Sequence, residues 1–194
     1  MQQPSGDWTY WEGDSETERY ITPSILRSLV TLRSFGASIP DAVFDNGVRS
    51  LLRNLSVYHE NEDILADAIW TLALLKHTPE ALELWKSIDT RKLHRHGYLA
   101  YAYAGKILSV LPPEIGRNLD VIMFSTGRDS LYRYFDELAD QGIYAQFLFD
   151  RGEEQKASAL LARIVSHTDL SSSFSSTQAR MQIFLALVKQ IRLA

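Results

Sequence analysis

The sequence contains no cysteine among its 194 residues. This absence excludes disulfide bonds, thiolate metal ligands, thiol nucleophiles and thioesters formed within the chain. Basic residues are not in excess either, since 20 Lys and Arg face 24 Asp and Glu, for a net charge of −4. Because no basic surplus exists to neutralise phosphates, we exclude nucleic acid as a main partner. No stretch approaches the roughly 18 apolar residues of a membrane span, so we expect no direct membrane span.

Several sequence motifs of catalysis and secretion are also missing. The first twenty residues lack a basic start and an apolar core, so we expect no signal peptide in this chain. The sequence has no His-Glu-x-x-His, no Gly-x-Ser-x-Gly and no glycine-rich phosphate loop. We therefore predict that the chain is not an enzyme and that it has no catalytic, cofactor-binding or metal site.

What the sequence does contain is a succession of apolar-periodic segments that predict an all-α fold. Thr22-Pro23 and Thr78-Pro79 each pair a capping hydroxyl with a proline at a helix start, and Asn61 is a further predicted N-cap. Gly36 and Gly152 are predicted to end helices. The predicted helices are 22–35, 40–56, 61–76, 79–88, 95–110, 113–124, 135–150, 153–167 and 174–193.

These helices alternate between two kinds. Segments 64–75, 98–108 and 181–193 are apolar on nearly all sides, whereas 79–88, 113–124 and 153–167 carry one apolar stripe and one polar face. A helix that is apolar all round is enclosed, and a striped helix lies on the surface. The alternation predicts two layers of inner and outer helices, arranged as a closed ring or as an open solenoid. We expect one helical domain over 1–194, with residues 1–19 forming an aromatic loop whose Trp8, Tyr10 and Trp11 pack on it.

Five short features invite a functional interpretation, and each has a simpler structural one. His94-x-His96 points to two faces of a helix and is interpreted as a solvated helix start rather than a metal site. Asp136 and Asp140 are interpreted as favourable charges near a helix N-terminus rather than a general acid and base. The remaining features are the core tyrosines Tyr98, Tyr101 and Tyr103, an incidental glycosylation pattern at Asn54-Leu55-Ser56, and a helix start at Glu153-Glu154-Gln155.

Five segments, in order, resemble the thioester domain of bacterial α-2-macroglobulins. QQPSGDWTYWEG (2–13) is similar to that domain's aromatic Gln/Gly/Trp motif. The segment 21–55, with its Gly36 to Pro40-Asp41 junction, is similar to the family's first inner helix and the helix after it. DILADAIWTLALLKH (63–77) and KLHRHGYLAYAYAGKIL (92–108) are similar to further inner helices, and Ser176-Thr177-Gln178 resembles the element near the domain's end.

The resemblance implies an α/α-toroid within a periplasmic or cell-surface protein that traps proteases through a bait region and a conformational collapse. It implies as partners the proteases met by the full-length parent protein, and the neighbouring macroglobulin domains. The family's reactive Cys-x-Glu-Gln precedes the aromatic motif and is absent here, so no catalytic residue of the family can be assigned to this chain. Phe174 stands where the family more often has Trp.

Two alternatives remain open at this stage. A tetratricopeptide-like α-hairpin scaffold for binding proteins would fit residues 152–167, but no period of about 34 residues is present. A terpene-cyclase-type enzyme on the same toroid would need Asp-rich clusters, and none occurs. The flanking gene sequence separates these classes, because β-sandwich domains and an upstream Cys-x-Glu-Gln would indicate a macroglobulin.

An incomplete ring would leave apolar edges on its terminal helices. We expect them on the 22–35 helix, through Ile25, Leu26, Leu29, Val30 and Leu32, and on the last helix, through Phe184, Leu187, Val188 and Ile191. Partial closure of the ring with some self-association, as a homodimer, is the expected response. Sedimentation over a hundredfold concentration range tests it, and a strictly monomeric chain that binds no hydrophobic dye would contradict it.

The lack of cysteine yields a direct chemical prediction. Because the chain cannot hold an acyl group as a thioester, methylamine should form no specific adduct with it. Intact-mass spectrometry after methylamine treatment checks this. A stoichiometric adduct would contradict the prediction.

Overall fold

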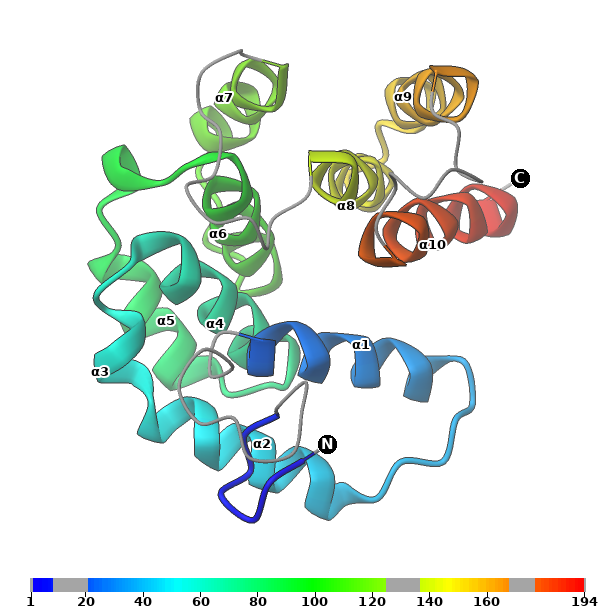
Figure 1. Cartoon of the computed structure of the whole chain (residues 1–194). Coiled ribbons are helices and arrows are strands. Elements are labelled where there is room, and N and C mark those ends of the chain that lie inside the picture. The colour runs from blue at the N-terminus through cyan, green and yellow to red at the C-terminus, as the bar shows by residue number, and fades with distance from the viewer. Residues whose placement is uncertain (1, 9–20, 125–136, 168–176, 194) are drawn as a thin grey trace. The chain divides into compact units, whose positions relative to one another are not determined.

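The computed structural model describes residues 2–8, 21–124, 137–167 and 177–193 (Figure 1). The helices are α1 (Thr22–Ser34), α2 (Asp41–Arg53), α3 (Leu55–Tyr58), α4 (Glu62–Leu74), α5 (Thr78–Ser87), the 3₁₀ helix η2 (Thr90–Lys92), α6 (Arg95–Ile107), α7 (Pro113–Phe124), α8 (Glu137–Asp150), α9 (Glu154–His167) and α10 (Thr177–Leu193). Over these residues the β-structure is limited to one isolated bridge between Gln2 and Trp8. The predicted all-α fold class is confirmed.

Several helix ends follow the predicted chemistry. The Asn61 side chain accepts hydrogen bonds from the backbone N–H groups of Asp63 and Ile64, which makes it the N-cap of α4. Gly36 and Gly152 follow α1 and α8 with φ of +91° and +76°. These are left-handed conformations that glycine adopts without steric strain, so both helices stop where the sequence predicts.

Other helix ends differ from the prediction. Thr22 and Thr78 are not caps, because the N-cap positions are Ile21 and His77 and neither helix has a side-chain cap. The Thr22 hydroxyl instead accepts a hydrogen bond from the Trp8 N–H. The predicted helix over 40–56 is broken at Asn54, whose side chain donates to Asp7.

The described contacts divide the chain into two compact units. Unit 1 comprises Met1–Leu93 and Ala100–Gly116, and unit 2 comprises His94–Leu99 and Arg117–Ala194. Helices α6 and α7 therefore contribute residues to both units. The single domain over 1–194 stays a prediction.

In unit 1, α4 is the enclosed helix. Residues 63–69 and 71–73 are buried, and α1, α3 and α5 pack against α4. In α5, Ala81 and Trp85 are buried while the opposite face is exposed. These burial patterns confirm the inner assignment of 64–75 and the outer assignment of 79–88.

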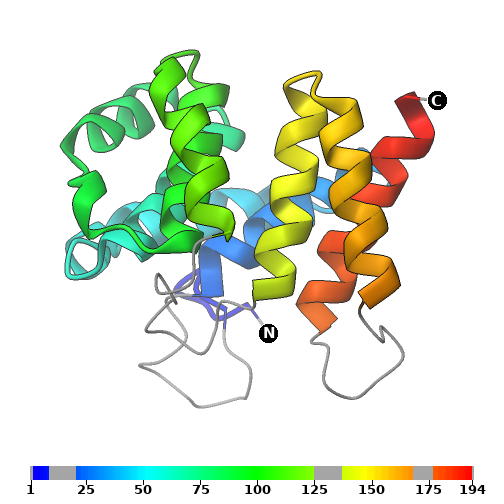
Figure 2. The same ribbon diagram turned by 90° about the horizontal axis from the view of Figure 1, so that it is seen from above.

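In unit 2, α8 is the enclosed helix, and it lies beside α9 and α10 with nearly parallel axes (Figures 1 and 2). Helix α9 buries one stripe formed by Ala157, Leu160, Leu161 and Ile164, as the outer assignment requires. Helix α10 departs from an enclosed helix. Its Leu185 is half-buried, and Phe184 and Ile191 are exposed.

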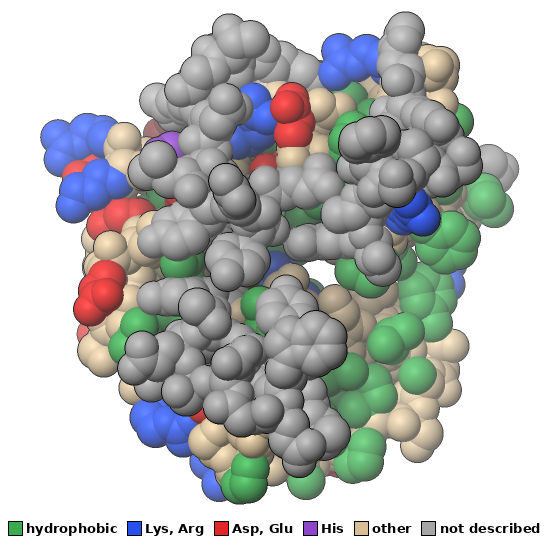
Figure 3. Space-filling model, in the orientation of Figure 1, with side chains coloured by type: hydrophobic (Ala, Val, Ile, Leu, Met, Phe, Trp, Pro, Cys, Tyr) green, Lys and Arg blue, Asp and Glu red, His purple; other side chains and the backbone are tan. Residues whose placement is uncertain are grey.

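The two expected apolar edges are present in part. On α1, Leu26 is buried, Ile25, Leu29 and Val30 are half-buried, and Leu32 is exposed. On α10, Leu187 and Val188 are half-buried. Figure 3 shows apolar side chains at the surface over the C-terminal part of α1. A homodimer stays a prediction.

No helix among the described residues is long and apolar enough to cross a membrane.

Gly142 sets the distance between α8 and α10. A Cβ placed there would lie 2.9 Å from the Gln182 carbonyl carbon and the Ile183 backbone nitrogen. Replacing a helical glycine with alanine ordinarily stabilises by about 1 kcal/mol. We expect Gly142→Ala to destabilise instead, by roughly 1–3 kcal/mol, because the backbone of α10 must move.

Urea unfolding followed by circular dichroism measures the effect. Gln141→Ala, one residue away, is the control and should change stability by less than about 0.5 kcal/mol. A Gly142→Ala protein more stable than the parent would show that α8 and α10 are not in close backbone contact.

Candidate functional site

Among the described residues, three groups of polar contacts centre on buried side chains, two in unit 1 and one in unit 2. We call them the N-terminal anchor (Asp7, Ser50, Arg53 and Asn54), the arginine cluster (Arg27, Asp67, Trp70 and Thr71) and the histidine–aspartate pair (His96 and Asp140). Each is described below from its contacts.

The N-terminal anchor holds residues 2–8 on α2. The Asp7 carboxylate accepts hydrogen bonds from the Ser50 hydroxyl and from Asn54 Nδ2 at 2.8 Å, and its second oxygen lies 3.0 Å from Arg53 Nη2. Next to it, Trp8 is only 8% exposed. The predicted packing of Trp8 is confirmed, and Tyr10 and Trp11 lie outside the described residues.

A glycine on α2 makes room for that indole ring. A Cβ at Gly47 would come within 2.8 Å of two Trp8 ring carbons and 2.7 Å of the Leu26 side chain. The aromatic segment therefore fits α2 only where α2 has no side chain. The Asn46-Gly47 pair, a turn by local propensity, belongs to the helix as predicted.

The environment of Asp7 lowers the pKa of its carboxyl group below the ordinary value of 3.8. Burial on its own raises the pKa of this carboxyl, but the hydrogen bonds from Ser50, Ser5 and Asn54 and the charge of Arg53 outweigh it. The ionised carboxylate is thus the form that the fold favours.

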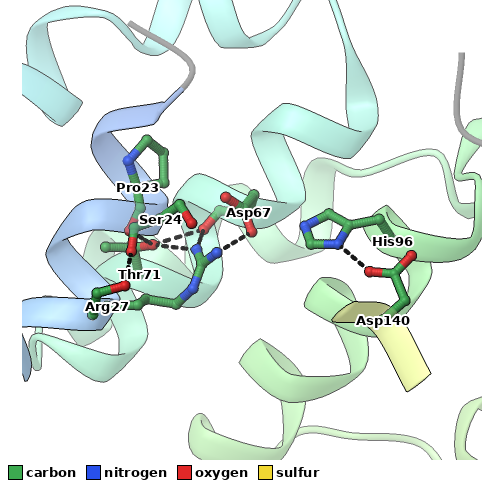
Figure 4. Close-up of polar contacts among 8 residues, drawn as sticks. Pro23, Ser24, Arg27, Asp67, Thr71, His96 and Asp140 are labelled. Atoms are coloured by element: carbon green, nitrogen blue, oxygen red, sulfur yellow. Dashed lines mark hydrogen bonds and ion pairs between the residues drawn. The ribbon is translucent and has the colours of Figure 1, made fainter. Parts of the chain in front are cut away.

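The arginine cluster joins α1 to α4 (Figure 4). Arg27 Nη2 lies 2.7 Å from Asp67 Oδ1, and Nη1 donates to the Asp67 carbonyl at 3.1 Å and to the Thr71 hydroxyl at 2.8 Å. The Thr71 hydroxyl in turn lies 3.2 Å from the Pro23 carbonyl oxygen. The guanidinium is thus paired and hydrogen-bonded in the interior, as a buried charge requires.

An aromatic stack continues this cluster toward α6. The Arg27 guanidinium lies 4.2 Å from the centre of a Trp70 ring, and Tyr103 stacks on Trp70 at 4.6 Å. In the same unit Tyr101 stacks on Trp85 at 4.5 Å, and Trp85 Nε1 donates to the Tyr101 carbonyl at 3.0 Å. Tyr98 is buried as well. The core interpretation of Tyr98, Tyr101 and Tyr103 is therefore confirmed.

The histidine–aspartate pair connects the first turn of α6 to α8. His96 Nδ1 lies 2.6 Å from Asp140 Oδ1, and the two side chains are 2% and 4% exposed (Figure 4). Beside them, Arg95 Nη1 lies 3.0 Å from Glu137 Oε1. The interpretation of His94-x-His96 as a solvated helix start is wrong for His96, because its face of the helix is the buried one.

The interpretation of Asp140 as a helix-dipole charge is also incomplete, because its carboxylate bonds directly to an imidazole. Asp136 lies outside the described residues. Sequence reasoning treated these residues separately, although a signal was present. An acidic residue within a nearly continuous apolar segment, such as Asp140 in 137–150, needs a buried partner, and His96 at the start of another apolar segment is one candidate.

A carboxylate that orients an imidazole is also how enzymes position a general base. A general base must reach its substrate, however, and the His96 side chain is almost fully enclosed. Among the described residues no three His, Asp or Glu side chains are grouped so that they could hold a metal ion. The geometry supports a structural tie between α6 and α8.

Two further sequence features have structural roles. Asn54 is buried, and its Nδ2 is bonded to Asp7, so the Asn54-Leu55-Ser56 pattern offers no accessible attachment point in this fold. Glu153 precedes α9 and forms ion pairs with Arg151 and Lys156. Both observations agree with the simpler interpretations.

Comparison with known proteins gives matches in structure alone. No family model and no curated protein matches the sequence. The native cryo-EM structure of Escherichia coli α-2-macroglobulin matches 97% of this chain and 13% of its own, with 20% identity and a TM-score of 0.72. A crystal structure of the same protein from domain MG7 to the C-terminus matches 98% of this chain and 32% of its own, with 21% identity and a TM-score of 0.70.

A crystal structure of a Salmonella α-2-macroglobulin mutant matches 97% of this chain and 13% of its own, with 19% identity and a TM-score of 0.73. The chain thus spans about a third or less of the length of the structures it matches. At such identities the likeness establishes the fold. It confirms, at the level of fold, the resemblance that implied an α/α-toroid.

The histidine–aspartate pair predicts strongly non-additive mutations. His96→Ala or Asp140→Ala alone should destabilise the protein by about 3–5 kcal/mol, because each leaves a buried polar or charged group without its partner. The double variant should lose clearly less than the sum of the two. Urea unfolding of all four proteins measures the coupling, and strictly additive effects would show that the contact contributes nothing.

The lowered pKa of Asp7 predicts a pH-dependent contribution of the N-terminal anchor. Since the folded-state pKa lies below 3.8, the stabilisation is fully present above that pH and is lost as the pH falls through the folded-state value. Asp7→Asn should therefore lower stability at pH 7 by about 1–3 kcal/mol. The difference from the parent should shrink below pH 3.8.

Urea unfolding followed by tryptophan fluorescence, at pH 7 and in acid, measures the difference in unfolding free energy between Asp7→Asn and the parent. Asp45→Asn, on the exposed side of α2, is the matched control and should change stability little at either pH. A difference between Asp7→Asn and the parent that stays constant into acid would contradict the assignment.

Proposed function

We propose that this chain is a non-catalytic part of a protein of the α-2-macroglobulin type, an endopeptidase inhibitor that traps proteases. The observation that carries the proposal is the fold match over 97–98% of the chain to bacterial α-2-macroglobulin structures. The five ordered sequence segments that resemble the family's thioester domain, from 2–13 to 176–178, support it as a separate observation. The tetratricopeptide-like scaffold finds no such support.

The chemistry of the chain suits a structural part of such a protein. The buried charges Arg27, Asp67 and Asp140 are used to hold helices together, and without cysteine the chain forms no thioester of its own. The exposed apolar residues on α1 and α10 would pack against neighbouring macroglobulin domains. We place the parent protein in the periplasm or at the cell surface, where foreign proteases are met.

A protease-protection assay tests the proposal. The longest natural polypeptide that contains this chain is mixed with trypsin, and hydrolysis of a small chromogenic peptide is compared with hydrolysis of casein. A physical trap should suppress casein hydrolysis while the small peptide is still cleaved, and the protease should co-elute with the larger protein in size-exclusion chromatography.

The isolated chain of 194 residues serves as the control and should protect neither substrate. Equal suppression of both substrates would indicate an active-site inhibitor instead. No suppression of either would overturn the proposal.

A further inference from the structure

Residues 2–8 form a small turn of their own before the first helix. The Gln3 N–H donates to the Asp7 carbonyl and the Gly6 N–H donates to the Gln3 carbonyl, both at 2.8 Å. An isolated β-bridge joins the first and last residues of the segment. We call residues 2–8 the strap, and it lies beside α2 (Figure 1). Its internal bonds give the strap a turn shape that does not depend on the helices alone.

The strap and α2 fit each other closely at two points. Gly47 of α2 has no side chain where the Trp8 ring lies, and a Cβ there would come within 2.8 Å of that ring. On the strap, Gly6 has a φ of +90°, and a Cβ there would lie 2.7 Å from the Asn46 carbonyl carbon. Each surface therefore lacks a side chain where the other approaches it. A close fit of this kind is typical of recognition surfaces.

Polar contacts hold the strap on the same helix. Gln2 Nε2 donates to the Val43 carbonyl at 3.0 Å, and Arg53 Nη2 donates to the Ser5 carbonyl at 2.9 Å. The Asp7 carboxylate adds the bonds of the N-terminal anchor. Hydrogen bonds thus fix the orientation of the strap while one buried aromatic ring supplies its large apolar contact, as in a bound peptide.

Release of the strap would expose little of the core of unit 1. Pro4 and Ser5 are exposed, and Gln2 and Gln3 are half-buried. The enclosed helix of this unit is α4, on which α1, α3 and α5 pack. A peripheral segment with few buried apolar contacts opens at a lower free energy than the core that it covers.

We propose that the strap detaches from α2 while unit 1 stays folded, and that the notch it leaves binds a Gly-Asp-Trp turn of another polypeptide. In the notch, Gly47 and Leu26 receive the indole ring, and Ser50, Arg53 and Asn54 bind the carboxylate. The ligand needs glycine because the Asn46 carbonyl leaves no room for a side chain at that position. In the intact chain the strap is an internal competitor for this site.

A second copy of the chain is the poorer source of such a turn. Exchange of straps between two copies would make no contact that each copy lacks, and it would lose the translational freedom of a second molecule. The inference concerns the surface of α2 and does not depend on the protease-trap proposal.

Two variants of the whole chain weaken the strap without changing the notch. Asp7→Ala with Trp8→Ala removes the two anchoring side chains, and Gly6→Ala places a methyl group against the Asn46 carbonyl. Gly36→Ala is the matched control for Gly6→Ala, because Gly36 has a φ of +91° but no described atom lies within 4 Å of a Cβ there. Urea unfolding followed by circular dichroism should show that all three proteins are folded in the absence of urea.

The probe is a labelled peptide with the sequence of residues 2–8, and fluorescence anisotropy measures its binding to each protein. Both strap-weakened variants should bind the peptide roughly tenfold more tightly than the parent and Gly36→Ala do, because in those two proteins the strap occupies the notch. A peptide with alanine in place of its tryptophan should bind roughly tenfold more weakly.

A third substitution tests whether the peptide lies in the notch. Gly47→Ala, added to Asp7→Ala and Trp8→Ala, places a methyl group where the indole ring lies and should weaken binding of the peptide roughly tenfold. The same change by itself favours the helical backbone of α2, so loss of binding would not reflect loss of the helix.

Each contrary result would overturn the proposal. If both strap-weakened variants are unfolded, the strap belongs to the core of unit 1. A folded variant that binds no peptide would show that the notch is not a binding site. Equal binding by the parent, or binding that Gly47→Ala leaves unchanged, would place the peptide elsewhere on the chain. In sedimentation velocity, a dimer of the parent that Gly6→Ala abolishes would assign the notch to the strap of a second copy.

Discussion

The Arg27–Asp67 ion pair fixes how α1 is aligned along α4 in unit 1. Both side chains are almost fully enclosed, and the guanidinium also bonds to Thr71 and lies over Trp70. Removing one partner of such a pair leaves a charge in a medium that solvates it poorly, so a shift of α1 along α4 is strongly unfavourable. Hydrophobic contacts alone would oppose such a shift only weakly, because the apolar residues of α1 could pack almost equally well one helical turn further along α4. The ion pair therefore selects one alignment of helices that apolar contacts stabilise.

Unit 2 uses a different constraint for the same purpose. Gly142 lets α8 approach α10 at the level of the backbone, and Gln146 of α8 then donates to the Gln182 carbonyl and side-chain oxygens. A close contact between two helices fixes both their separation and their sliding position, because only the residue without a side chain can stand at the crossing. His96 and Asp140 hold the first turn of α6 against the N-terminal part of α8.

The helices themselves could be predicted from the sequence because their apolar residues recur with helical spacing, and this pattern is local. Asn61 and Gly152 were predictable for the same reason, since a cap depends on a few neighbouring residues. The pairing of His96 with Asp140 could not be derived so directly. The two residues are 44 positions apart, and which faces of α6 and α8 meet is decided by packing over the whole unit. Thr22 shows the same limit. Local sequence rules predict that its hydroxyl caps α1, but the hydroxyl instead accepts a hydrogen bond from the backbone N–H of Trp8, 14 residues away.

The buried polar contacts described above lie within the two units. Asp7, Arg27, Asp67 and Asp140 each bind another part of the same unit, so these groups contribute to alignment rather than to recognition of a partner. Among the described residues, large exposed apolar side chains lie on α1, α6, α7, α9 and α10. A fold shared at about 20% identity with far longer proteins is consistent with this division, because packing preserves the pattern of apolar and small residues while the individual side chains change.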